Sequence, residues 1–223
     1  MRFLSIIAMF FVISACTQIT YVEELAESGA DSEEPRGLFD RNVTFKIADS
    51  LYRNSPRCVM IAPLMTRNMT KEMTFLIEDS IARHAGQRID KVIGAGQVYE
   101  NMRIRALDIT KPKHLRRLAH EMRCGTIIML ETKGAEGSYA VIFAQLKFAL
   151  KLTMKRIQDN SIIWQGYHQA SRSDGGLPFG LLSIPVNAIQ AGRFSNDGDV
   201  LPSIVDDVTR RIFASLPNLR IVR

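Results

Sequence analysis

The sequence lacks the motifs that mark common catalytic and metal centres. It contains no GxSxG nucleophile elbow, P-loop, HExxH zinc motif or CxxC pair. Gly94-Ala95-Gly96 begins a dinucleotide-binding fingerprint, but Tyr99 stands where the third glycine is needed. His114 and His120 are six residues apart on an expected helix, which places them about 240° apart around its axis. The two side chains therefore cannot bind the same metal ion from one face of the helix. We expect no catalytic residue, no metal site and no cofactor, and a protein that is not an enzyme.

Long apolar runs are also scarce, and the one at the N-terminus is short. Phe3 to Ile13 is apolar apart from Ser5 and follows Arg2. This stretch is too short to span a bilayer stably and is typical of a secretory signal peptide. No later stretch reaches about eighteen consecutive apolar residues, so we expect no transmembrane helix in the mature chain.

Ser14 and Ala15 stand directly before Cys16. This arrangement resembles the lipobox of bacterial lipoproteins, which implies that residues 1–15 are removed and that Cys16 is acylated and becomes the mature N-terminus. Thr17 stands where an aspartate would suggest retention at the inner membrane in enteric bacteria, which implies a lipid anchor in the outer membrane and a body facing the periplasm. The alternative is an ordinary signal peptide cut near Ala15.

Charge divides the mature chain into two parts. Residues 17–40 contain seven acids and one arginine, a net charge of −6, together with Gly29, Pro35 and Gly37. We expect residues 16–40 to form a lipidated N-terminus and a flexible tether. Because the whole chain carries +6 and the leader contributes Arg2, residues 41–223 carry +11. This basic part, expected to be one globular domain, favours anionic partners; nucleic acid is improbable as a partner because the protein is expected to be exported.

Cysteine is rare, with three in the chain. With Cys16 assigned to the lipid, Cys58 and Cys124 remain as a pair in a compartment where disulfides persist. Each opens an apolar run, so both lie at one end of the sheet if the two strands are parallel neighbours. A disulfide requires Cα atoms within about 7 Å, and two buried thiols are the alternative.

Apolar periodicity predicts an α/β fold with a mixed sheet. Strands are expected over residues 57–64, 91–94 and 124–131, with amphipathic helices over 70–85 and from Thr110 onward between them, a pattern typical of a parallel core. Residues 145–155 and 162–169 alternate apolar and polar residues around a polar turn and predict an antiparallel hairpin. A C-terminal helix is expected over 202–215, and a short helix over 42–52.

Two surface segments are candidate contact sites. The basic cluster near residue 115 is denser than an ordinary solvated helix face and could bind an anionic partner; it comprises Lys111, Lys113, Arg116, Arg117 and Arg123. A segment over residues 177–189 is apolar, uncharged and interrupted by prolines, and could contact the membrane or another subunit; its apolar residues are Leu177, Phe179, Leu181, Leu182 and Ile184. A solvated basic face and a loop packed over the core are the alternatives.

The order of these segments resembles a known group of proteins. Lipobox and tether are followed by RCVMIAPL, LRRLAHEMRCGTIIMLE, the hairpin AQLKFALKLTMKRIQDNSIIWQGYHQAS, the segment GGLPFGLLSIPVNAI and a terminal helix. Over residues 55–217 this is similar to outer-membrane lipoproteins of the CsgG and TolB-N-terminal-like type, close to a lipoprotein family of unknown function. Cys124-Gly125 stands where that family often has Gly-Ala-Asp.

The resemblance implies a domain used for assembly. We expect an accessory component of a secretion, pilus or glycan complex of the envelope, acting on envelope protein partners or by self-association. One alternative is an oligomeric, CsgG-like export channel subunit, which would insert hairpins into the outer membrane. The other is a periplasmic hydrolase with a dispersed site.

Overall fold

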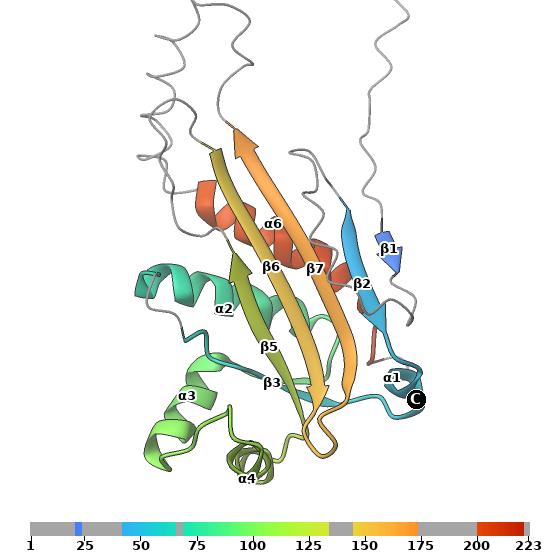
Figure 1. The fold of residues 1–223 in the computed structure, drawn as a ribbon, viewed down its shortest axis with the longest axis vertical. Coiled ribbons are helices and arrows are strands. Elements are labelled where there is room, and N and C mark those ends of the chain that lie inside the picture. Colours follow the sequence, from blue (N-terminus) through green and yellow to red (C-terminus); the bar gives the residue numbers. More distant parts are fainter. Residues whose placement is uncertain (1–20, 24–41, 66–68, 134–144, 174–199, 221–223) are drawn as a thin grey trace, which may run out of the picture.

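A computed structural model describes residues 21–23, 42–65, 69–133, 145–173 and 200–220 (Figure 1). These residues form a seven-stranded mixed sheet in the order β1-β2-β7-β6-β5-β3-β4, with helices packed on it. The strands are β1 (Tyr21–Glu23), β2 (Val43–Ile47), β3 (Cys58–Ile61), β4 (Lys91–Ile93), β5 (Thr126–Lys133), β6 (Gln145–Arg156) and β7 (Ile162–Ser173). The helices are α1 (Asp49–Arg53), α2 (Lys71–Gly86), α3 (Ala95–Ile104), α4 (Pro112–Met122) and α6 (Val200–Ala214).

One half of the sheet is parallel, which confirms the fold class expected from the sequence. Strand β3 pairs in parallel with β4 on one side and with β5 on the other. Helix α2 connects β3 to β4, and α3 and α4 connect β4 to β5. Thr70 caps α2 as expected, since its Oγ1 accepts a hydrogen bond from the Met73 N–H at 3.2 Å.

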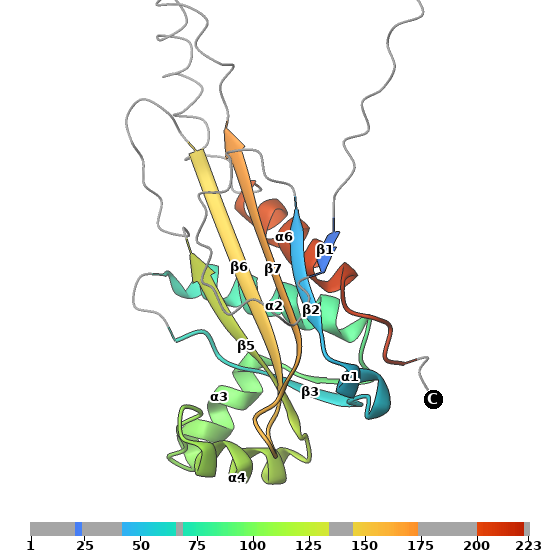
Figure 2. The same ribbon diagram turned by 45° about the vertical axis from the view of Figure 1, so that its right-hand side comes forward.

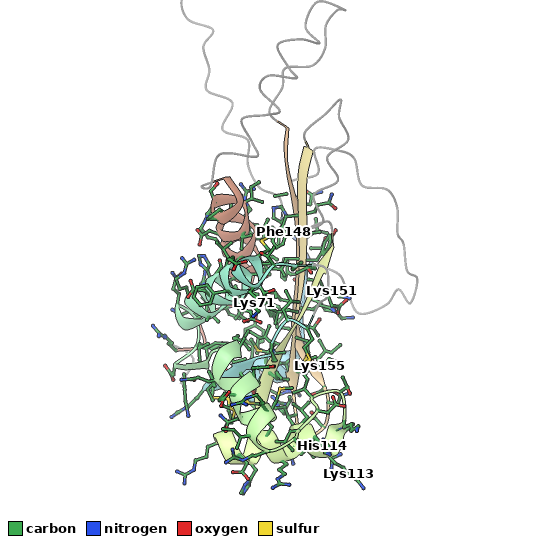
Figure 3. All side chains as sticks on the ribbon, turned by 90° about the vertical axis from the view of Figure 1, so that its left-hand side faces the viewer. Lys71, Lys113, His114, Phe148, Lys151 and Lys155 are labelled. Atoms are coloured by element: carbon green, nitrogen blue, oxygen red, sulfur yellow. A yellow bond between two sulfur atoms is a disulfide. The ribbon has the colours of Figure 1, made fainter. Side chains whose placement is uncertain are left out.

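The other half is built on a long hairpin and is antiparallel apart from β1, which pairs in parallel with β2. Strands β6 and β7 pair along most of their length, β6 also pairs with β5, and β7 also pairs with β2. Phe148 is buried on the face that carries α2 and α6, whereas Lys151 and Lys155, an odd number of residues along the strand, lie on the opposite face (Figure 3). This is the alternation that the sequence predicted. On the face that carries the lysines, Lys151 forms a cross-strand ion pair of 3.9 Å with Glu131 of β5.

The helices cover both faces of the sheet. Helices α2 and α6 lie side by side across one face, while α3 and α4 lie against the other face near the end where β3 and β5 begin (Figures 1 and 2). The larger core lies under α2 and α6, where Trp164 of β7 stacks on Phe213 of α6 with ring centroids 5.5 Å apart. Gly166 permits this close packing, because a Cβ there would stand 2.7 Å from Cγ2 of Ile212.

Three elements differ from the sequence prediction. The helix expected over residues 42–52 is wrong: the segment forms β2 and then the short helix α1. The spacing of Val43 and Ile47 fits either a helix or a strand, and pairing with β7 decides for the strand. Helix α3 was not foreseen, and β1 lies inside the segment expected to be the tether and pairs with β2. In the described ranges, no helix is both long and apolar enough to cross a bilayer.

Candidate functional site

The topology gathers basic residues at one end of the sheet. The parallel strands β3 and β5 begin at this end, and β6, antiparallel to β5, finishes there. Arg57 precedes β3, Arg156 closes β6, and α4 lies over the start of β5. Cations that are far apart in the sequence therefore meet around one point.

A cleft of about 690 Å³ opens at this point. Its lining includes Arg57, Arg116, His120 and Arg156, which come from three separate segments of the chain, and no acidic side chain. We call it the basic cleft. Its volume is in the range of sites that hold small ligands, so it has room for more than a single ion.

Arg156 is held in place by the backbone of α1. Its Nη2 donates hydrogen bonds to the carbonyl oxygens of Ser50, at 3.3 Å, and Asn54, at 3.0 Å. These contacts use the two N–H groups of Nη2 and leave those of Nε and Nη1 for other partners. The guanidinium is therefore oriented before any ligand arrives.

One acid that interacts electrostatically with this guanidinium, Asp159, belongs to the β6–β7 turn. Asp159 Oδ1 accepts hydrogen bonds from the Ser161 hydroxyl at 2.7 Å and the Ser161 N–H at 3.0 Å. These two hydrogen bonds, with a smaller contribution from the charge of Arg156, hold the pKa of Asp159 below its ordinary value. The carboxylate does not line the cleft, and its hydrogen bonds keep it within its own turn.

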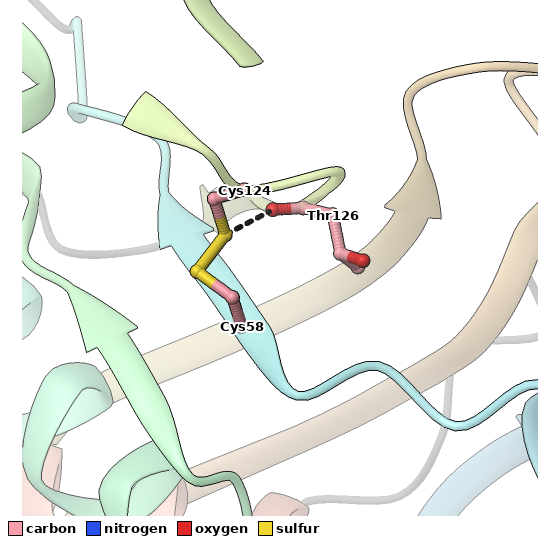
Figure 4. Close-up of a disulfide and its surroundings, with 3 residues drawn as sticks. All are labelled: Cys58, Cys124 and Thr126. Carbon is pink, nitrogen blue, oxygen red and sulfur yellow. Dashed lines mark hydrogen bonds between the residues drawn. A yellow bond between two sulfur atoms is a disulfide. The ribbon is translucent and has the colours of Figure 1, made fainter. Parts of the chain in front are cut away.

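Cys58 lines the cleft and forms a disulfide with Cys124 (Figure 4). The Cα atoms are 5.4 Å apart, and the bond ties the start of β3 to the residue that leads from α4 into β5. Cys124 is buried, and its sulfur lies 3.8 Å from the Thr126 carbonyl oxygen; a disulfide sulfur has no proton to donate, so this is a packing contact. The bridge fixes Arg57 relative to the helix that carries Arg116. Sequence alone left open whether these cysteines were bridged or were two buried thiols.

The basic cluster expected from the sequence is only partly assembled into the cleft. Arg116 lines it, whereas Lys113, Arg117 and Arg123 are exposed on or beside α4 outside the lining (Lys113 is labelled in Figure 3). Lys111 lies 3.8 Å from Asp108, a surface ion pair of its own segment.

Sequence reasoning missed Arg57, His120 and Arg156. Two sequence signals could have found them. Arg57 and Arg156 flank the ends of expected strands that meet at one sheet edge, and His120 follows Arg116 by four residues and so shares its helix face.

A second group of polar side chains lies between α2 and α6. His84 Nε2 is 3.0 Å from Asp206 Oδ1, and Arg83 Nη1 is 3.2 Å from the same oxygen. Ser80 lies one turn before His84, but its Oγ is fully buried and forms no hydrogen bond within the described residues. Ser80 therefore does not complete a nucleophile–base–acid relay with His84 and Asp206 in this structure, and the His84–Asp206 contact joins α2 to α6.

Two predicted sites lie outside the described residues. They are the lipidation site Cys16 and the apolar contact segment with Leu177, Phe179, Leu181, Leu182 and Ile184. Both remain predictions from the sequence. Among the residues that the structure does describe, no three histidine, cysteine or acidic side chains gather as they would around a metal ion.

Comparisons with known proteins give partial structural likenesses. No protein-family model matches the chain, and no curated protein matches it. A PelC dodecamer structure from Paraburkholderia phytofirmans has 9% identity, covers 77% of this chain and 94% of that one, and gives a TM-score of 0.45. Lipoprotein GNA1162 from Neisseria meningitidis has 15% identity over 64% of this chain and 100% of that one, with a TM-score of 0.44.

The hypothetical protein CT253 from Chlamydia trachomatis gives 16% identity over 72% of this chain and 100% of that one, with a TM-score of 0.34. One of these structural neighbours is described as a lipoprotein. A specific relation to CsgG stays a prediction. At these TM-scores no function passes from the neighbours to this chain.

Proposed function

We propose that this protein is a lipid-anchored lipoprotein of the outer membrane that faces the periplasm and acts by binding, as an accessory component of an envelope complex. Cys16 is its anchor, and only residues 17–20 stand between it and β1, which pairs with β2 in the sheet. The basic cleft is its binding site for an anionic partner. The protein is not an enzyme in this proposal.

The observation that carries the proposal is the composition of the basic cleft. Three arginines and one histidine line it without an acid. Like charges repel, by about 0.5 kcal/mol for two cations 8 Å apart in water and more where protein excludes water. A cluster whose lining holds no acid is therefore a place where an anion gains binding energy, since it relieves this repulsion.

The role of the second polar group agrees with binding. His84 and Asp206 are engaged with each other, and the hydroxyl that could act as nucleophile beside them is buried. Their position between α2 and α6 makes them part of the packing of two helices. A catalytic role for this group would require Ser80 to become exposed.

Anchoring and location are tested by fractionation of cells that produce the wild-type chain or Cys16→Ala. We expect the wild type in the outer-membrane fraction, with three acyl chains on the Cys16 peptide by mass spectrometry, and the variant in the soluble periplasm. Wild-type protein found soluble and unmodified would contradict the anchor.

Native mass then separates an accessory protein from a channel subunit. Light scattering after size exclusion is applied to the detergent-solubilised wild type and to soluble Cys16→Ala. A monomer or small complex in both is expected for an accessory component. A large, uniform ring that forms in detergent alone would instead favour the channel subunit and would contradict the proposal.

A further inference from the structure

We propose that the basic cleft binds a phosphate group, carried either by a soluble sugar or by a lipid head group. The inference rests on the proposed function in one respect, that the cleft is a binding site, and it names the ligand chemistry. It does not depend on where the protein is anchored.

The cations of the cleft are of the kind that suits phosphate. All three are arginines, and none is lysine. A guanidinium presents paired N–H groups in a plane and binds phosphate oxygens two at a time, whereas an ammonium acts as a point charge. Arginine at these positions therefore favours directed binding of an oxyanion over undirected attraction of any negative surface.

The geometry around Arg156 gives the site a fixed centre. Carbonyl oxygens of Ser50 and Asn54 hold its Nη2, so the free N–H groups of this half-buried side chain are already oriented. Arg57 and Arg116 approach from β3 and α4, and neither forms an ion pair with an acid of the described residues. The disulfide holds the backbones of these two elements together, so ordering on binding is confined to the exposed side chains of Arg57 and Arg116.

The rest of the lining indicates that the phosphate is attached to an uncharged group. Pro56, Ala119 and Ile157 contribute apolar surface, and Gln158 contributes an amide. A cleft of about 690 Å³ is far larger than one phosphate and suits a sugar ring or the glycerol part of a head group.

Phosphate is favoured over carboxylate by charge and by the number of oxygens. A phosphate monoester carries a charge of about −1.5 to −2 at pH 7 and three acceptor oxygens. A carboxylate carries one charge and two oxygens. The site should therefore discriminate between a sugar phosphate and a sugar acid of similar size.

The test uses soluble Cys16→Ala protein titrated with glucose 1-phosphate, glucuronate and glucose, by isothermal titration calorimetry at fixed ionic strength. Two variants decide whether binding occurs in the cleft. Arg116→Gln and Arg117→Gln each remove one positive charge at adjacent exposed positions of α4, but only Arg116 lines the cleft. Equal thermal unfolding of both variants and the parent checks that the fold is kept.

We expect saturable binding of glucose 1-phosphate that weakens at least tenfold in Arg116→Gln and less than twofold in Arg117→Gln. Glucuronate should bind at least tenfold more weakly than the phosphate. Equal losses in the two variants, equal affinity for glucuronate, or no binding in both this titration and the vesicle assay below would each overturn the proposal. None of these results alters the fractionation or native mass, so the anchored accessory role is tested separately from the phosphate site.

Sedimentation with vesicles identifies the carrier of the phosphate. The same proteins are mixed with phosphatidylcholine vesicles with or without phosphatidic acid. Binding that needs phosphatidic acid and is lost in Arg116→Gln but kept in Arg117→Gln supports a lipid head group, even where glucose 1-phosphate fails to bind. Binding of glucose 1-phosphate alone supports a soluble sugar phosphate. Vesicle binding reduced equally by both substitutions shows general attraction to a negative surface and counts against the site.

Discussion

The disulfide between Cys58 and Cys124 should dominate the stability of the domain. Their separation is 66 residues, so the bond closes a long loop in the unfolded chain. In the chain-entropy model a loop of this length contributes about 4 kcal/mol at 25 °C. For a domain of this size such a loss lowers the melting temperature by roughly 8 to 16 °C.

The experiment compares oxidised and reduced protein in the Cys16→Ala background, where Cys58 and Cys124 are the only cysteines. Guanidinium unfolding followed by circular dichroism gives the free energy of unfolding with and without reductant. The variant Cys58→Ala/Cys124→Ala serves as control and should match the reduced protein within about 1 kcal/mol, the cost of the small side-chain change at these sites. A loss below about 1 kcal/mol on reduction would refute the loop-closure argument.

Three further outcomes follow from single side chains. Gly166→Ala should cost about 1 to 3 kcal/mol of unfolding free energy, because the new Cβ would clash with Ile212; an unchanged denaturation midpoint would contradict this close packing. Thr70→Ala should cost about 1 kcal/mol through loss of the α2 cap, whereas Thr70→Ser should cost much less. Burial alone raises the pKa of Asp206, but the hydrogen bond and charge of His84, with Arg83, outweigh it and hold the pKa below its ordinary value. This stabilisation is present above about pH 4, the ordinary value of an aspartate in an unfolded chain, and is lost as the pH falls through the lowered pKa. Unfolding at pH 7, 4 and 3 should therefore show a smaller acid loss for Asp206→Asn than for the wild type, and equal losses would contradict it.

Most elements of the sheet were predictable because their signals are local. The apolar runs at β3 and β5, the cap and stripe of α2, and the alternation along β6 and β7 each depend on a few neighbouring residues. The failures occurred where the local signal was short or ambiguous. Residues 43–47 fit two periods, and α3 begins at glycine and alanine, without a side-chain cap.

The candidate site was predictable only in part. The density of positive charge near residue 115 marked Arg116, but the same density also marked Arg117 and Lys113, which lie outside the cleft. No local sequence signal distinguishes these neighbours. The difference depends on which side of α4 faces the start of β3 and the end of β6. Arg156 became part of the site through its hydrogen bonds to carbonyls more than a hundred residues away.

The sequence by itself determined the class of fold and the division of charge into an acidic stretch over residues 17–40 and a basic remainder, and it predicts a signal peptide and an anchor. These properties follow from composition, from apolar periodicity and from short motifs, all of which act within a few residues. Tertiary structure alone decided that the two cysteines meet and that cations from three segments share one cleft without an acid. The physical reason is that the order and direction of the strands decide which strand ends lie next to one another. Strand order and direction depend in turn on packing across the whole sheet.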